Sequence, residues 1–262
     1  PTALNGAEDD LATWAELSVT DLRRAMVDAD DARRARFYRW LPGSGRIGLY
    51  PILIDGLEDR NPIVVESALR ALAKSRSQLL VDNLQRIRSL TEDPQARVRE
   101  VAAIVLGRLG DDRALDYLIP LLNDQQRVAR AAHQALTIIA RTDHGLDRAA
   151  WEDWFQDWII VEDEVIPQLI AAYETEGLRK DKVRILHKLL QFKAHRHSVG
   201  GFLAELIDTE EDPTILNLAM DGTRNLSGVA ALKSPKTRSR AASGQILAAV
   251  SEYDSGTPHT AP

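Results

Sequence analysis

Apolar residues recur through the first half of the chain at intervals of three and four, which places them on one side of an α-helix. Three segments share this spacing: VVESALRAL at 64–72, VREVAAIVL at 98–106 and VARAAHQAL at 128–136. In each segment a valine, an alanine and a leucine stand four residues apart, and the small alanine leaves room for a neighbouring helix. The segments begin 34 and 30 residues apart. We therefore expect three related helices, one in each copy of a repeated unit.

A shorter apolar stripe precedes each of these helices. It runs through residues 53–57, 84–90 and 118–122, and each time it ends in polar residues. The unit is therefore read as helix, short polar turn, helix. Hairpins of this size cannot bury their apolar faces alone, so consecutive units must stack. The predicted fold class is all-α: an α-α superhelix, that is, a right-handed solenoid of helical hairpins.

The middle copy carries the clearest motif. Residues 93–111 read DPQARVREVAAIVLGRLGD, with a proline before the second helix, Val-Arg at its start and Leu-Gly-x-Leu-Gly-Asp at its end. This motif resembles the signature of HEAT-like repeats, especially the short bacterial class named after phycobilisome lyases. The resemblance covers residues 46–147 as three units, although Val65 and Ala129 stand where the motif has its arginine. It implies a helical-repeat protein.

The end of the motif has a physical interpretation. Gly107 is expected to allow close packing of a neighbouring helix, because it has no Cβ. Gly110 is expected to stop the helix in the left-handed conformation that glycine adopts without strain. Asp111 and Asp112 then stand where a following helix begins, and capping explains such an acidic pair.

The flanking segments complete the predicted domain organisation. Residues 1–45 are predicted to form an N-terminal helical cap, with Thr20 as the N-cap of one helix. Three regular repeats follow in 46–148, then a Trp-rich helix and degenerate helical repeats in 149–253. The small, polar residues 254–262 are expected to form a disordered tail.

Aromatic residues cluster directly after the third repeat. Trp151, Trp154, Phe155 and Trp158 have the spacing i, i+3, i+4, i+7, which is one face of a helix, and Asp147 is a suitable N-cap for it. One interpretation is core packing between regular and irregular repeats. The other is an aromatic docking surface for a peptide or ligand, formed by Trp151, Trp154 and Trp158.

Composition supports the helical reading and excludes some function classes. Hydrophobic residues make up 44% of the 262 and aromatic residues only 5%, which favours helix over strand. The formal charge of -6 gives no support for a nucleic-acid or anionic-membrane partner. With no cysteine, disulfides and thiolate chemistry are excluded. No apolar stretch reaches the length of a membrane span, and both a cytoplasmic and an exported location stay open.

Candidate chemistry along the chain is sparse. His195 and His197, with His187 before them, could approach a metal, but we interpret them as a solvated helix end because no carboxylate stands at ligand spacing. Residues 43–48 fit Gly-x-Gly-x-x-Gly, but a dinucleotide site needs a preceding strand, and none is predicted. Phosphate-loop and nucleophile-elbow motifs are absent from the sequence. We therefore expect no catalytic residues, no metal and no cofactor.

The expected function is a non-catalytic protein-interaction scaffold, acting as a monomer. Repeat proteins hold partners on the surface that successive second helices form. Charged and polar residues at equivalent places beside the buried stripe should form a ladder on that surface. The residues predicted to bind a protein or peptide are Glu66, Arg70, Arg99, Glu100, Arg130 and Gln134.

Two alternatives come from the resemblance. One is an enzyme or chromophore chaperone resembling phycobilin lyases, which attach or remove a tetrapyrrole on a protein. The other is DNA binding of the kind found in HEAT-like glycosylases, which need a basic groove. Residues 79–148 balance ten basic against ten acidic side chains, which disfavours the DNA-binding alternative.

Overall fold

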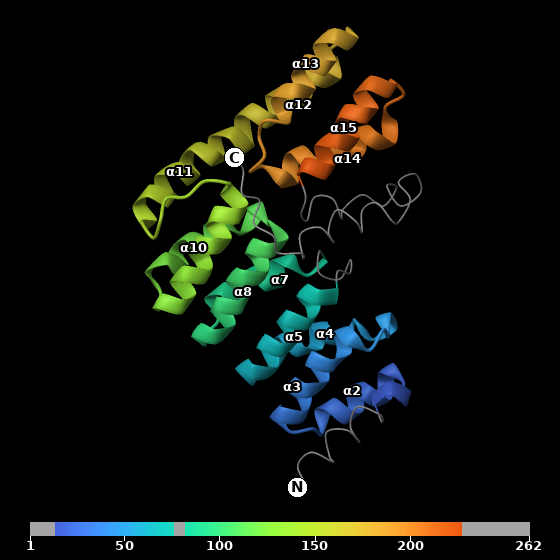
Figure 1. The fold of residues 1–262 in the computed structure, drawn as a ribbon, viewed down its shortest axis with the longest axis vertical. Coiled ribbons are helices and arrows are strands. Elements are labelled where there is room, and N and C mark those ends of the chain that lie inside the picture. Colours follow the sequence, from blue (N-terminus) through green and yellow to red (C-terminus); the bar gives the residue numbers. More distant parts are fainter. Residues whose placement is uncertain (1–13, 76–81, 227–262) are drawn as a thin grey trace, which may run out of the picture. The chain divides into compact units, whose positions relative to one another are not determined.

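The computed structural model describes residues 14–75 and 82–226 (Figure 1). In these ranges all regular structure is helical and there is no strand, so the predicted all-α fold class is confirmed. None of the described helices combines the length and apolar character needed to span a bilayer. The predicted disordered tail at 254–262, and the part of the degenerate repeats beyond residue 226, lie outside the described residues, as do the first 13 residues of the predicted cap.

The chain divides into two compact units, and each is described by itself. The first comprises residues up to 105 together with 125–131, and the second comprises 106–124 together with the residues from 132 onward. The division falls inside two of the predicted repeat helices. The domain boundaries predicted at 45 and 148 follow the repeats and stay predictions.

Two helices, α2 (Val19–Val27) and α3 (Asp31–Trp40), begin the first unit. The N-cap of α2 is Ser18, whose hydroxyl oxygen accepts a hydrogen bond from the backbone N–H of Asp21 at 3.2 Å. The prediction of Thr20 as N-cap is wrong by two residues. Ser18 has the extended backbone that a cap requires, so the helix already includes Thr20.

An aromatic cluster fills the interior of this N-terminal region. Phe37 is fully buried, and its ring meets that of Trp14 edge to face with centroids 5.4 Å apart. Trp40 lies against the same indole at 5.7 Å. The guanidinium of Arg46 donates to the carbonyl of Trp14 at 2.7 Å, which ties the residues after α3 to the start of the described chain. Trp14, Phe37 and Trp40 therefore pack as one cluster.

All three predicted hairpins are present, but the first arm of each is broken. The second arms are continuous α-helices: α5 (Pro62–Ser75), α8 (Ala96–Leu109) and α10 (Gln126–Ala140). The first arms combine a short α-helix with 3₁₀ turns: α4 (Ile52–Asp55) with η3 (Gly56–Glu58), α7 (Leu84–Ser89) with η4 (Leu90–Glu92), and η5 (Asp112–Ala114) with α9 (Leu115–Leu118) and η6 (Ile119–Asn123). Such 3₁₀ turns tighten the end of a helix before the chain reverses. Two further 3₁₀ turns, η1 (Leu41–Gly43) and η2 (Ile47–Leu49), occupy the Gly-x-Gly segment, where the described chain has no strand.

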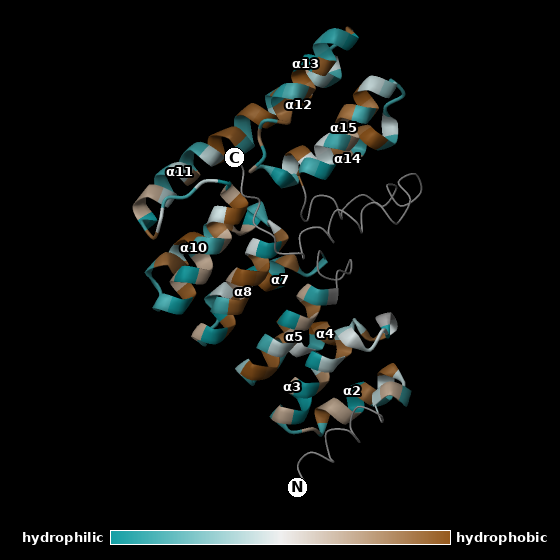
Figure 2. Cartoon of the chain, viewed as in Figure 1, coloured by the Kyte–Doolittle hydropathy of each residue, from teal (hydrophilic) through white to brown (hydrophobic). Residues whose placement is uncertain are grey.

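The predicted core stripe of the second arms is confirmed. Figure 2 shows hydrophobic and hydrophilic residues on different sides of α5, α8 and α10. Burial of each valine or leucine side chain contributes about 1.5–3 kcal/mol relative to leaving it exposed. The buried valines, alanines and leucines at equivalent places are Val64, Ala68, Leu72, Val98, Ala102, Leu106, Val128, Ala132 and Leu136.

The end of α8 behaves as its two glycines predict. A Cβ on Gly107 would lie 2.6 Å from the Cα of Ala135, so only glycine lets α10 approach this closely. Gly110 has φ +61°, and its N–H donates to the Gly107 carbonyl at 3.0 Å. The next N–H, of Asp111, donates to the Leu106 carbonyl at 3.2 Å. These two bonds form a Schellman motif, which satisfies the last carbonyls of the helix.

The remaining helices belong to the second unit. They are α11 (Arg148–Ile160), a π-helical turn η7 (Val161–Val165), α12 (Ile166–Thr175), α13 (Arg179–Leu189), α14 (Arg196–Thr209) and α15 (Pro213–Asn225). The predicted cap of α11 is confirmed, because the Asp147 carboxylate accepts from the N–H groups of Ala149 and Ala150. Helices α12 to α15 share a core, the buried cluster of Ile166, Leu186, Leu189, Val199, Leu203, Ile215 and Ala219.

Candidate functional site

Two glutamates at equivalent positions link consecutive repeats of the first unit. The Glu66 carboxylate of α5 accepts from Arg70 Nε at 3.0 Å and from Arg97 Nε of α8. In the next repeat, the Glu100 carboxylate of α8 accepts from Arg127 of α10 at 3.3 Å. Each pair joins a glutamate two residues after the stripe valine to an arginine one residue before the next stripe valine. The same ion pair therefore recurs with the period of the repeat.

The glutamates and arginines of these ion pairs differ sharply in the exposed fraction of their side chains. The Glu66 and Glu100 side chains are 9% and 19% exposed, whereas those of Arg70, Arg97 and Arg127 are 52%, 62% and 82% exposed. Burial raises the pKa of Glu66, but the hydrogen bonds from its two arginines outweigh that effect and hold the pKa below the usual value. The carboxylate is therefore ionised at neutral pH. The charge that this face presents to solvent is nonetheless mainly that of its arginines.

The remaining predicted ladder residues have different environments. Arg99 is half-buried, and its guanidinium donates to the carbonyls of Asp93 at 2.7 Å and Pro94 at 3.1 Å, which holds the turn before α8. Arg130 and Gln134 are both exposed on α10. Arg99 therefore has a structural role in this turn, while Arg130 and Gln134 are available to a partner.

The predicted surface ladder is therefore only partly exposed to solvent. The Glu66 side chain is buried beneath the arginines. Its carboxylate is paired with Arg70 of the same helix and with Arg97 of the following repeat. Sequence reasoning overlooked Arg97 and Arg127, although their shared place before the stripe valines was a signal. We use the name arginine row for the exposed residues Arg70, Arg97, Arg127 and Arg130.

Glu66→Gln is expected to lower the free energy of unfolding by about 1–2 kcal/mol, because it leaves two arginines beside a neutral side chain. The exposed Glu92→Gln is the matched control, with an expected change within about 0.5 kcal/mol. Urea denaturation followed by circular dichroism measures both. Equal effects of the two substitutions would contradict the structural role assigned to Glu66.

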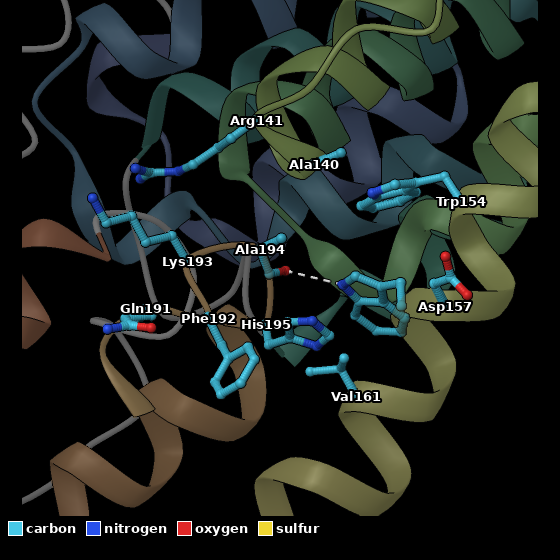
Figure 3. Close-up of a pocket in the computed structure, with 11 residues that line it drawn as sticks. Ala140, Arg141, Trp154, Asp157, Val161, Gln191, Phe192, Lys193, Ala194 and His195 are labelled. Carbon is cyan, nitrogen blue, oxygen red and sulfur yellow. Dashed lines mark hydrogen bonds between the residues drawn. The ribbon is translucent and has the colours of Figure 1, made fainter. Parts of the chain in front are cut away.

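The three tryptophans predicted for docking fall into two classes. Trp151 is fully buried, its indole N–H donates to the Gly145 carbonyl at 2.9 Å, and its ring packs on His144 with centroids 4.8 Å apart. Trp154 and Trp158 are half-buried and line an open hollow in the second unit (Figure 3). Trp151 is therefore a core residue, whereas Trp154 and Trp158 remain candidates for docking a partner.

A buried polar cluster surrounds the start of α14. The Asp112 carboxylate accepts from the backbone N–H of His197 at 2.6 Å. The Glu162 carboxylate contacts His195 Nδ1 at 2.9 Å and accepts from the Ser198 hydroxyl. The residue at the N-cap position, His195, makes no capping hydrogen bond of its own. A carboxylate 85 residues earlier in the chain therefore caps this helix.

This cluster corrects the interpretation of His195 as part of a solvated helix end, whereas His187 is exposed in the last turn of α13 and His197 is half-buried. His195 and Arg196 are each only 5% exposed, and Arg196 donates to the Ile138 carbonyl at 3.1 Å. Sequence periodicity cannot show this, because the groups that enclose them come from η5, η7 and the end of α10. Among the described residues, no set of three or more acidic or histidine side chains is arranged to hold a metal.

The two carboxylates of the cluster have opposite pKa shifts. Burial raises the pKa of Asp112 to about 7, and the nearby carboxylates of Asp111 and Glu162 act in the same direction. Burial also raises the pKa of Glu162, but the hydrogen bonds from His195 and Ser198 outweigh it, and the pKa lies below its usual value. Of these two carboxyl groups, Asp112 is therefore the one whose charge changes near neutral pH.

Comparison with protein-family models matches residues 50–137 to the family described as HEAT repeats. The matched range lies within the residues 46–147 that the motif predicts. A search of curated proteins finds no match to this chain. The more specific likeness to the repeats of phycobilisome lyases stays a prediction. Residues 50–137 of this chain are therefore HEAT repeats.

Proposed function

We propose that this chain is a non-catalytic scaffold that binds an acidic segment of a protein partner over the arginine row. HEAT repeats commonly serve protein interactions, and successive second helices of such arrays line the surface that holds a partner. The arginine row lies on those helices, α5, α8 and α10. The observation that supports this proposal most strongly is the contrast between covered carboxylates and exposed guanidinium groups.

The charge balance of this face favours a protein over a nucleic acid. Four arginines of the row stand against Glu66 and Glu100, and three of the four already share one of these carboxylates. A polyanion needs unpaired cations along its whole backbone, and such binding falls steeply with salt. A short acidic segment needs only a few charge-assisted hydrogen bonds, which guanidinium groups donate to carboxylates in bidentate geometry.

Affinity capture from native cell extract tests the proposal. The chain should retain one or a few stoichiometric proteins at low salt. The variant Arg70→Gln/Arg127→Gln/Arg130→Gln should bind them about tenfold more weakly. It should keep its helicity, because the three replaced side chains are exposed and Arg97 still pairs with Glu66. The matched control, Arg24→Gln/Arg113→Gln/Arg224→Gln, removes the same charge from exposed positions outside the second arms.

Two outcomes would contradict the proposal. Equal loss of binding in both triple variants would show that only the total charge matters. The second outcome is measured by the absorbance of the eluate. A bound chromophore without a protein partner would favour the lyase-like alternative. Quantitative mass spectrometry of the three eluates decides between these results.

A further inference from the structure

The second unit contains an open hollow of about 390 Å³ with aromatic walls (Figure 3). Its aromatic lining is formed by Trp154 and Trp158 of α11 together with Phe192 and His195 of the segment between α13 and α14. This volume is at the lower end of the range for small-ligand pockets, so it suits one or two side chains and no folded element. The charged residues at its rim are Arg141, Asp157 and Lys193.

The aromatic wall is held in place by contacts on several sides. The rings of Trp158 and His195 are stacked with centroids 4.7 Å apart and an angle of 6° between their planes. The Trp158 indole N–H donates to the Ala194 carbonyl at 3.4 Å, and Glu162 fixes His195 through Nδ1. Phe192 meets the imidazole edge to face at 5.9 Å. A guest side chain would therefore meet a preorganised wall, which reduces the entropy lost on binding.

Arg141 has an unusual backbone for its residue type. It follows α10 with φ 59°, a left-handed conformation that costs an ordinary residue about 1–2 kcal/mol and is normally taken by glycine. Its guanidinium donates to the Asn225 carbonyl at 3.2 Å and lines the hollow. Strained backbone conformations of this kind are enriched at ligand sites.

The charges around the hollow are polarised. Figure 3 shows the side chains of Arg141 and Lys193 on one side of the ring cluster and that of Asp157 on the opposite side. Aromatic ring edges also carry partial positive charge and favour acceptor oxygens. A ligand that fits this surface has a bulky apolar side chain that fills the hollow. It also has a neighbouring carboxylate that points toward Arg141 and Lys193.

We propose that this hollow is a second protein-binding site, which holds an apolar side chain of a partner segment while an adjacent Asp or Glu carboxylate pairs with Arg141 and Lys193. The site uses residues of the second unit only and does not depend on the arginine row. Its occupant is a short peptide segment, because the rim offers hydrogen-bonding groups at two ends and the volume accepts about one anchor side chain.

Titration of ¹⁵N-labelled protein with unlabelled blocked peptides tests this site. The indole N–H signals of the five tryptophans are assigned with single Trp→Phe variants. Acetyl-Gly-Glu-Phe-Gly-amide should shift the Trp154 and Trp158 signals saturably and leave the Trp14 signal in place. The peptides with Gln for Glu, or Ala for Phe, should bind about tenfold more weakly, because each loses one of the two recognition elements.

A variant pair shows whether the cations recognise the carboxylate. Arg141→Gly/Lys193→Gln should lower the affinity for the Glu-Phe peptide about tenfold and leave the affinity for the Gln-Phe peptide unchanged. Glycine suits the left-handed backbone at 141, so this variant should fold normally. Arg184→Gln/Lys188→Gln removes two charges from exposed positions on α13 and should change neither peptide.

Three results would overturn the proposal. The first is the absence of any Trp154 or Trp158 shift at saturating peptide. The second is equal affinity for the Glu-Phe and Gln-Phe peptides. The third is tighter binding of 3-phenylpropanoate than of the Glu-Phe peptide, because the site would then belong to a small aromatic acid and not to a protein segment.

Discussion

Replacing Trp151 by alanine is expected to destabilise the second unit by about 3–5 kcal/mol. The indole is fully buried, so its removal leaves a large cavity and exposes the edges of His144 and Trp154. It also deprives the Gly145 carbonyl of its 2.9 Å hydrogen bond, which closes the turn before α11. The loss would be a large part of the total stability of a domain of this size.

Two further substitutions separate the causes of this loss. Trp151→Phe keeps an aromatic ring and loses the hydrogen-bond donor. We expect it to lower the free energy of unfolding by about 1–2 kcal/mol, because of the missing hydrogen bond and the smaller ring. Trp154→Ala is the control on the same helix face. Its side chain is only half-buried, and we expect about half the effect of Trp151→Ala or less. Urea denaturation monitored by circular dichroism gives the three values, and equal losses at 151 and 154 would contradict the assignment of Trp151 to the core.

Asp112→Asn is expected to stabilise the protein at pH 8 and to have little effect at pH 4. The pKa of Asp112 is 3.8 in an unfolded chain and about 7 in the fold, so folding favours the protonated form. As pH rises from about 4 to 7, the unfolded chain ionises first and the folded state loses stability relative to it. This difference corresponds to an upper limit of about 4 kcal/mol at alkaline pH.

Asparagine is a suitable probe because it is neutral at every pH. Its side-chain oxygen can still accept from the His197 N–H, so the cap on α14 is retained. The other charged groups that face Asp112 are Asp111, Glu162 and Arg196, and they are unchanged in the variant. The quantity to follow is therefore the stability of Asp112→Asn minus that of the unsubstituted chain, since other carboxyl groups also titrate in this range.

Denaturation midpoints at intervals between pH 4 and pH 8 measure this difference. We expect it to grow by about 2–4 kcal/mol across the range and to level off above pH 7. Asp163→Asn, an exposed carboxylate on η7, is the matched control and should give a nearly constant difference. A difference between Asp112→Asn and the unsubstituted chain that stays constant with pH would show that Asp112 is ionised throughout, as a solvated carboxylate would be.

Local features of this fold could be predicted because their causes lie within a few residues. The stripe from Val98 to Leu106 is set by helical periodicity, and the left-handed stop at Gly110 follows from the absence of a Cβ. The cap at Asp147 follows from the polar residue directly before an apolar helix face. The family match covers residues 50–137, which include this stripe and Gly110.

The features that could not be predicted depend on partners far apart in sequence. Glu66 is buried because Arg97 of the following repeat reaches its carboxylate. His195 and Arg196 are buried because η5 and η7 bring Asp112 and Glu162 to the start of α14. The acidic pair Asp111-Asp112 looks like an ordinary cap in the sequence, but Asp111 makes no side-chain capping hydrogen bond to η5. Asp112 instead caps the distant helix α14, which only the tertiary fold shows.

We propose that the arginine row is the surface where an acidic partner segment binds. The most direct measurement is photo-crosslinking from benzoylphenylalanine placed at position 130, with position 113 as the exposed control outside the second arms. We predict that position 130 crosslinks a protein partner through a peptide rich in Asp and Glu, and that position 113 gives no such product. Crosslinks of equal yield from both positions, or a crosslinked peptide without acidic residues, would contradict the claim.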